Sequence, residues 1–201
     1  MKLYSYIVTH DTGFAPNPFW GCCTVATCKP DIRRNAQVGE WIIGLSPKVS
    51  DNRVIFAMEV DEILDFASYY RDSRFANKIP DYSRPEVVWK AGDNIYKPLA
   101  EGEFQQLRST HSHRHEENAE MKEHDLHSTN VLIARKFHYF GGSGPELPPH
   151  LDNLKVGVGH KNHFSQETID HFLVSISSYP QGVIAPPTSW PASDKSWKLP
   201  A

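Results

Sequence analysis

The segment Phe14–Gly44, FAPNPFWGCCTVATCKPDIRRNAQVGEWIIG, constrains the fold of this sequence more than any other part of it. Helices and strands repeat the character of their side chains about every 3.6 or 2 residues. This segment shows neither period before its apolar end at 41–44, and it carries two prolines around an asparagine, three cysteines and a basic cluster. Such a density of special residues predicts a shaped loop that presents chemistry, without identifying that chemistry.

The length and charge of the chain limit its class. A chain of 201 residues is long enough to bury a real core. We expect one domain over 1–201, with a loop-rich insertion at 77–130 and an irregular tail at 180–201. The formal net charge is −3 and the isoelectric point about 6.4. Proteins that grip long nucleic acids usually present a basic face, so this composition allows only a small basic patch or a pocket for one nucleotide.

Neither the cysteines nor the apolar residues indicate secretion or membrane insertion. The three cysteines are odd in number and lack the paired C-x-x-C of zinc sites. The opening residues MKLYSYIVTHD lack the apolar core of a signal peptide. No apolar run reaches the ~18–20 residues of a membrane span. We therefore expect a soluble cytoplasmic protein without a membrane partner.

Strands dominate the expected core. Segments rich in β-branched and aromatic residues predict strands, and a 3/4 apolar spacing predicts helices, of which the second begins at Ser165 as N-cap. The expected strands are Leu3–Val8, Glu40–Gly44, Arg53–Val60 and Val131–Phe140, and the expected helices are Asp61–Phe75 and Ser165–Ser178. Both faces of 53–60 are mostly apolar, as in a strand covered on both sides or one that closes a barrel. The sum favours an α+β fold: a partly open mixed β-barrel with flanking helices and long loops.

The Pro-Asn-Pro-Phe-Trp turn is the first candidate for ligand contact. Two prolines preset the backbone around Asn17, whose carboxamide can pair with the edge of a base. The neighbouring rings of Phe19 and Trp20 can stack on a planar ligand. The plainer alternative is a stiff turn whose aromatic residues plug one end of the barrel.

The basic run that follows is a candidate for phosphate contact. Lys29, Arg33 and Arg34 give a local excess of positive charge, and guanidinium groups suit bidentate phosphate binding. A run this short is often a solvated turn, so that alternative stays open. The neighbouring cysteines include a possible nucleophile, but the sequence identifies no partner base, and buried structural thiols are favoured.

The histidine-rich tract at 111–127 invites a metal interpretation. In a strand, His111, His113 and His115 would share one face. An arginine and five nearby acidic residues dilute the case, and no known ligand spacing is matched. We therefore predict no metal and no cofactor. His113 is expected to act as a general acid or base or as a donor to a ligand phosphate, with a solvated loop as the alternative.

Two further pairs complete the candidate ligand-binding residues. Asp93 and Asn94 lie in the turn GDNIY, where such residues are common for backbone reasons alone. Tyr139 and Phe140 end a strand just before two glycines, which permit close approach of a ligand. Core aromatic residues followed by a plain turn are the alternative.

Several segments together resemble the nucleotide-modification-associated domain family of the second type. They are FAPNPFWG, CTVATCKPDIRR, VGEWIIG, RVIFAMEVDEIL, GDNIY and VLIARKFHYFGG, in this order over most of the chain. The resemblance implies a fold similar to the PUA, ASCH and EVE group, and an association with systems that make or handle modified nucleotides in phages and bacteria. Glu40 stands where the family often has Asp.

The resemblance implies recognition of a modified base or nucleotide in nucleic acid, because EVE and YTH relatives hold a modified base in an aromatic pocket. DNA is favoured over RNA as the partner. The alternative is an enzyme, a transferase or hydrolase, that acts on a nucleotide or modified base; the sequence assigns no catalytic residues. A third hypothesis is an accessory protein that binds other proteins. The oligomeric state is not specified by the sequence.

Overall fold

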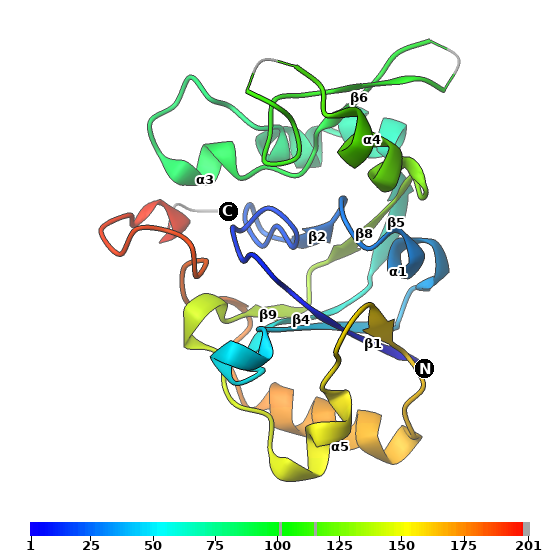
Figure 1. The fold of residues 1–201 in the computed structure, drawn as a ribbon, viewed down its shortest axis with the longest axis vertical. Helices are drawn as coiled ribbons and strands as arrows, with labels where there is room; N and C mark the ends of the chain where they lie inside the picture. The colour runs from blue at the N-terminus through cyan, green and yellow to red at the C-terminus, as the bar shows by residue number, and fades with distance from the viewer. Residues whose placement is uncertain (101, 115, 199–201) are drawn as a thin grey trace.

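The strands form three sheets, which Figure 1 shows in a computed structural model that describes residues 1–100, 102–114 and 116–198. The largest sheet has the strand order β10-β1-β3-β4-β9-β11. Its strands in chain order are β1 (Leu3–Ile7), β3 (Trp41–Leu45), β4 (Val54–Glu59), β9 (Phe137–Tyr139), β10 (His160–Lys161) and β11 (Gly182–Val183).

A second sheet has the order β2-β8-β5, and a separate antiparallel pair lies beyond it. The strands are β2 (Cys23–Val25), β5 (Glu62–Asp65) and β8 (Asn130–Ala134), with β6 (Tyr96–Pro98) and β7 (Phe104–Gln106) in the pair. The first two sheets are joined by a bend, because β4 leads into β5 and β8 leads into β9. Glu59 N donates to Lys136 O at 3.0 Å and Asp61 N to Ile133 O at 2.8 Å, so the hydrogen-bond ladder continues through the bend.

The non-periodic segment Phe14–Gly44 forms most of the crossover connection from β1 to β3 and ends within β3. β1 and β3 are parallel neighbours, with Leu3 opposite Trp41 and Ile7 opposite Leu45. Parallel neighbours cannot be joined by a tight hairpin and need a long connection. The chain between them contains β2 and the short helix α1 (Pro30–Asn35). The lack of periodicity over this segment therefore reflects a connection that leaves one sheet, adds a strand to another and returns.

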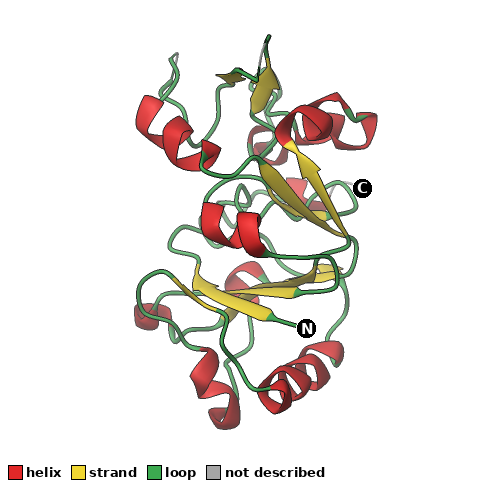
Figure 2. Cartoon of the chain, turned by 90° about the vertical axis from the view of Figure 1, so that its right-hand side faces the viewer, coloured by secondary structure: helices red, strands yellow, loops and turns green. Residues whose placement is uncertain are grey.

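The largest sheet is covered on both faces. One face packs against the second sheet through Tyr4, Phe56 and Met58, which meet Val25 and Leu132. The other face packs against helix α5 (Gln166–Ser177), visible below the sheet in Figures 1 and 2. The prediction that the strand at 53–60 is covered on both sides is confirmed.

Helix α5 forms where its local sequence predicts it. The Ser165 hydroxyl accepts from Thr168 N at 3.2 Å and caps the first turn. Ile169, Phe172 and Ile176 repeat at the helical period and are buried against the sheet. The predicted helix at 165–178 is confirmed.

The other helices are short. They are α2 (Phe66–Arg71), α3 (Val87–Lys90), α4 (Ala119–Leu126) and the 3₁₀ turns Lys48–Ser50, Ser73–Lys78, Gly141–Ser143, Pro149–Leu154 and Ser196–Lys198. The residues expected as a loop-rich insertion, 77–130, lie over one end of the molecule in Figure 1 and contain α3, α4 and the β6–β7 pair.

The structure confirms the α+β class and corrects several expected details. The strands are divided among three sheets rather than one. The described residues form no closed barrel, which leaves the predicted partly open, PUA-like barrel a prediction. The expected helix at 61–75 is wrong in its first part, because Ile63 and Leu64 pair with β8 and the helix begins only at Phe66. The expected strand at 131–140 is two strands, divided by the bend at Arg135 and Lys136.

None of the helices in the described part of the chain combines the length and apolar character needed to cross a membrane. Residues 199–201 of the predicted tail lie outside the described residues, as does His115 of the histidine tract.

Candidate active site

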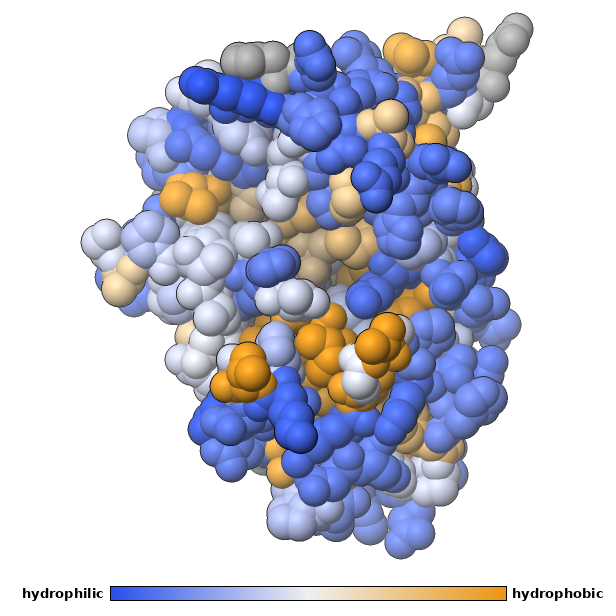
Figure 3. Space-filling model, viewed as in Figure 1, coloured by the Kyte–Doolittle hydropathy of each residue, from blue (hydrophilic) through white to orange (hydrophobic). Residues whose placement is uncertain are grey.

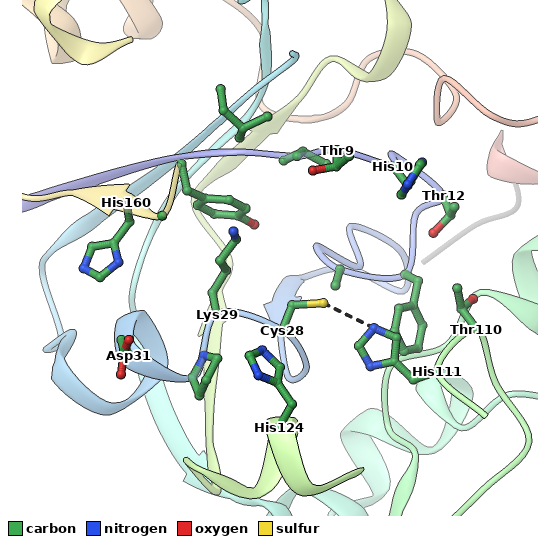
Figure 4. A pocket seen from close by; sticks show the side chains of 17 residues that line it. Thr9, His10, Thr12, Cys28, Lys29, Asp31, Thr110, His111, His124 and His160 are labelled. Carbon is green, nitrogen blue, oxygen red and sulfur yellow. Dashed lines mark hydrogen bonds between the residues drawn. The ribbon is translucent and has the colours of Figure 1, made fainter. Parts of the chain in front are cut away.

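A cavity of about 560 Å³ opens between the end of β1, the start of α1 and the histidine-rich tract. Its wall includes Tyr6 and Val8 from the first strand and its continuation, and Cys28 and Lys29 from the turn before α1. His111 completes the opposite side (Figure 4). The face drawn in Figure 3 is hollowed at mid-height, where β1 crosses in Figure 1. The cavity thus lies where segments from distant parts of the chain meet.

The turn that carries Cys28 has an uncommon backbone. Cys28 and Lys29 have φ values of 57° and 41°, the left-handed region that non-glycine residues rarely occupy. Backbone strain of this kind persists only where the surroundings impose it, and it concentrates at functional sites. Here the Cys28 N–H donates to Asp125 Oδ1 at 2.8 Å, which ties the turn to helix α4.

Three side chains form a chain of contacts that begins at the cavity wall with Cys28 and His111 and ends at the buried Asp125. The Cys28 sulfur lies 3.3 Å from His111 Nε2. The other ring nitrogen of His111, Nδ1, lies 2.7 Å from Asp125 Oδ2. Tyr96 donates its hydroxyl to the same carboxylate oxygen at 2.8 Å. A thiol, an imidazole and a carboxylate in this order have the geometry of a nucleophile, its base and the group that orients the base.

The electrostatics of the chain favour a charged imidazole. Burial by itself lowers the pKa of His111, but the hydrogen bonds and charges of Asp125 and Cys28 outweigh it and raise that pKa to about 9. Burial raises the pKa of Asp125, and the contacts with His111, Tyr96 and the Cys28 N–H bring it below its ordinary value. Burial and the neighbouring carboxylate raise the pKa of Tyr96, so its hydroxyl stays a neutral donor.

Arg33 holds the two halves of the site together. Its side chain is fully buried, with Nε donating to Cys28 O at 2.8 Å and Nη2 to Asp125 O at 2.6 Å. Nη1 donates to Asn130 O at 2.9 Å and also to Ser128 O. Burial lowers the pKa of Arg33 to about 10, against the opposing charge of Asp125, so the guanidinium is charged at neutral pH. The side chain thus links four backbone carbonyls and does not line the cavity.

The three residues are also a possible set of metal ligands. Asp125 contacts Nδ1 of His111, whereas Cys28 contacts Nε2, and these two nitrogens lie on opposite sides of the ring. An ion bound between the sulfur and Nε2 would have two ligands from this group, with Asp125 only orienting the ring. Catalytic zinc sites use three protein ligands, so the arrangement fits proton transfer better than metal binding.

The candidate residues from the sequence do not converge on one cavity. Lys29 lines the cavity beside Cys28. Arg33 is buried behind it, and Arg34 lies on the surface, where it donates to His127 O at 2.7 Å. His113 is exposed and borders a different hollow of about 330 Å³.

Asn17 is fully buried and paired within the protein. Its Nδ2 donates to Gly13 O at 3.0 Å and Ala91 O at 2.8 Å, and its Oδ1 accepts from Lys78 Nζ at 2.7 Å. The carboxamide therefore connects the crossover segment to the insertion at 77–130 through hydrogen bonds. Its donors and acceptor are used within the protein and do not line a cavity.

Asp93 and Asn94 belong to the same buried layer. Asp93 accepts from Thr24 Oγ1 at 2.6 Å and from the Tyr69 hydroxyl at 2.7 Å, and burial raises its pKa. Asn94 Nδ2 donates to Tyr69 O at 3.2 Å and Phe75 O at 3.3 Å. These contacts account for both residues as structural partners of β2 and α2.

The predicted aromatic residues divide between a surface cavity and the core. Phe19 and Trp20 line a second cavity of about 510 Å³, together with Arg135. The Trp20 backbone has a φ of 63°. Tyr139 and Phe140 are fully buried; the Tyr139 hydroxyl donates to Asp11, and Phe140 packs within the core on the α5 side.

Sequence reasoning did not find the Cys28–His111–Asp125 arrangement. His111 lies 83 positions after Cys28, and Asp125 lies 97 positions after it. No local spacing connects residues so far apart. The histidine tract drew notice as a group, but only the fold selects His111 from it.

Together the fold and the cavity define a mixed α+β protein with a thiol–imidazole–carboxylate chain at the wall of a small-molecule-sized cavity. The chain belongs to the family described as nucleotide modification associated domain 2, whose model matches residues 1–194. This confirms the family that the sequence segments resemble and connects the chain with nucleotide modification. No curated protein and no solved structure gives a significant match.

Proposed function

We propose that this protein is a cysteine-dependent enzyme, a transferase or hydrolase, that acts on a nucleotide or a modified base. The observation that carries the proposal is the contact chain from Cys28 through His111 to Asp125 at the wall of the 560 Å³ cavity. The family is associated with nucleotide modification, which indicates a nucleotide or modified base as the substrate. From the sequence, recognition of a modified base or nucleotide is favoured and an enzyme is the alternative. The arrangement of these three side chains favours the enzyme.

In the proposed reaction, His111 is an imidazolium beside the Cys28 thiolate, and a sulfur lone pair forms a bond to an electrophilic carbon of the substrate. The bond from that carbon to its leaving group breaks, and the leaving group departs with the bonding electrons and receives the proton from His111. Water in a hydrolase, or an acceptor hydroxyl or amine in a transferase, then displaces the sulfur. Its proton passes to His111, and the sulfur leaves with its bonding electrons, which restores the thiolate and the imidazolium.

The surroundings of the three residues support this assignment. Asp125 accepts from Tyr96, from the Cys28 N–H and from His111, so the base is held in one orientation with Nε2 toward the sulfur. Such fixed orientation is what a nucleophile and its base require.

Alkylation with iodoacetamide, read by mass spectrometry, tests the activation of the thiol. We expect Cys28 to react much faster than the buried Cys22 and Cys23, which serve as internal controls. His111→Gln is expected to slow the reaction at Cys28 at least tenfold at pH 7.5, because the sulfur loses the charged imidazole that stabilises its thiolate. Equal rates in the wild type and in His111→Gln would contradict the proposal.

Incubation with nucleotides and modified nucleosides, with mass detection of products and of adducts on Cys28, tests the reaction itself. Cys28→Ser is the matched control and is expected to abolish turnover. Turnover that survives Cys28→Ser would contradict the role of the thiol. A complete lack of turnover and adducts across nucleotide classes would count against an enzyme.

Recognition of a modified base is the second candidate, and one observation favours it. The cavity beside Phe19 and Trp20 combines aromatic walls with Arg135 and Lys198, which suit a base and its phosphate. Titration of oligonucleotides with and without modified bases tests it, with Trp20→Ala as the variant. Binding that is equal for all oligonucleotides, or unchanged by Trp20→Ala, would sink this candidate.

A further inference from the structure

We infer that the cavity beside Cys28 takes a free phosphorylated nucleotide, with a phosphate against the Lys29 ammonium. The inference rests on the proposed function in using the same site, and it adds the chemical class of the substrate. It assigns phosphate contact to Lys29 and not to Arg33 or Arg34, although the three form one basic run in the sequence.

The three basic residues of this run occupy different environments in the fold. Arg33 donates hydrogen bonds to four backbone carbonyls. Arg34 is on the surface, where it meets Asp31 at 3.6 Å and His127 O. Lys29 alone lines the cavity. The basic run thus supplies one cation to the site.

The Lys29 ammonium has no carboxylate and no carbonyl partner among residues 1–100, 102–114 and 116–198. Its side chain is half-buried, and Nζ lies 5.0 Å from the centre of the Tyr6 ring. The face of the Tyr6 ring attracts the ammonium but brings no net charge, so the ammonium can still bind the negative charge of a ligand.

The rest of the cavity wall does not provide that charge. Its one carboxylate is Asp31, which faces Arg34 at 3.6 Å. Besides Cys28, Lys29, His111 and the Tyr6 phenol, the titratable groups among the lining residues are the imidazoles of His10, His124 and His160. A phosphate matches a wall of this composition, since it is a strong acceptor for ammonium and imidazole donors.

Lys29 and Cys28 are adjacent in the chain, and Figure 4 shows their side chains on the same wall, with His111 facing the sulfur. A phosphate held by Lys29 would therefore place the remainder of the ligand beside the nucleophile. Tyr6, Val8 and Phe14 give the cavity an apolar portion for a base or sugar.

The size of the cavity and the charge of the protein favour a single nucleotide over a nucleic acid strand. A volume of about 560 Å³ lies within the range of small-molecule sites. The chain has a net charge of −3, whereas binding to a polymer draws on many phosphate contacts and a basic face.

Protection of Cys28 against iodoacetamide measures occupancy of the cavity. The probes are the 5′-monophosphates of the common nucleosides, the same nucleosides without phosphate, inorganic phosphate, and single-stranded oligonucleotides of the same bases. We expect at least one monophosphate to protect Cys28 at concentrations at least tenfold lower than its nucleoside or its oligonucleotide. Inorganic phosphate is expected to protect weakly.

Lys29→Met keeps most of the side-chain volume and removes the charge, and Arg34→Met is the matched control one turn away and outside the cavity. We expect Lys29→Met to weaken protection by the monophosphate at least tenfold, and Arg34→Met to leave it within about twofold. Thermal unfolding without ligand checks that both variants fold.

Equal protection by nucleoside and monophosphate, better protection by oligonucleotide, no protection by any probe, or equal effects of the two variants would each overturn the inference. None of these results would touch the proposed function, which is tested by the reactivity of Cys28 without ligand and by turnover in the wild type and Cys28→Ser. If Cys28 proves unreactive, ligand-induced shifts in the thermal unfolding of Cys28→Ser with the same probes test the phosphate site by themselves.

Discussion

Replacing Asp125 by asparagine tests whether its carboxylate sets the charge of His111. In the folded protein the pKa of His111 is raised from 6.5 to about 9, although burial alone would lower it. This rise corresponds to about 3 kcal/mol of preferential stabilisation of the charged imidazole. Asparagine keeps the shape of Asp125 but offers one acceptor oxygen and no charge, so most of that stabilisation should disappear.

The sign of the effect follows from proton linkage. Because the folded-state pKa of His111 lies above its unfolded value, its contribution is fully present below about pH 6.5 and is lost as the pH rises through about 9. Within this window the free energy of unfolding contributed by His111 falls by about 1.4 kcal/mol per pH unit. In Asp125→Asn this part of the slope should vanish, so the two proteins should differ most near pH 6 and least near pH 9.5.

Urea unfolding followed by tryptophan fluorescence, repeated between pH 6 and 9.5, provides the measurement. Other groups that titrate in this range are common to both proteins, so the comparison removes them. His111→Gln is the control, because it deletes the titrating group and should give the same shallow slope as Asp125→Asn. If the wild type and Asp125→Asn lose stability in parallel over this range, the coupling between the two residues is refuted.

Three further changes test the packing, each by urea unfolding. Lys78→Met should cost about 3–5 kcal/mol, because the buried ammonium donates to three oxygens that would lose their partner. Gly144→Ala should cost about 1–3 kcal/mol, since its Cβ would lie 1.8 Å from a backbone oxygen, whereas Gly157→Ala meets nothing within 4 Å and should be neutral. Phe172→Ala should cost about 3–5 kcal/mol and the exposed Val174→Ala less than about 0.5; equal effects within either pair would contradict the packing.

Local elements of the fold could be predicted because their causes are local. Helix α5 has its cap and its buried stripe within one stretch of sequence, and the antiparallel pair β3–β4 follows from two apolar runs with a polar turn between them. The boundary at Phe66 was not predictable in this way. The residues before it form a strand because β8, far along the chain, offers them hydrogen-bond partners.

The roles of individual polar residues were decided by the tertiary structure. The sequence around Asn17 predicts a rigid carboxamide that contacts a ligand. In the structure the carboxamide is buried and accepts a hydrogen bond from Lys78, so it connects parts of the fold instead. Cys28 had no partner base in its own segment. The fold supplies His111 and Asp125 from the histidine-rich tract and α4.

The sequence by itself determined the family, the α+β class, the periodic elements and the presence of a non-periodic segment between the first two strands of the large sheet. Only the tertiary structure decided that this segment is a crossover between parallel strands, that it places Cys28 on a cavity, and that Lys29 faces the same space. The physical reason is that periodicity and capping are properties of neighbouring residues. A nucleophile, its base and the orienting carboxylate are instead set by contacts across 83 and 97 positions, which exist only once the chain has folded.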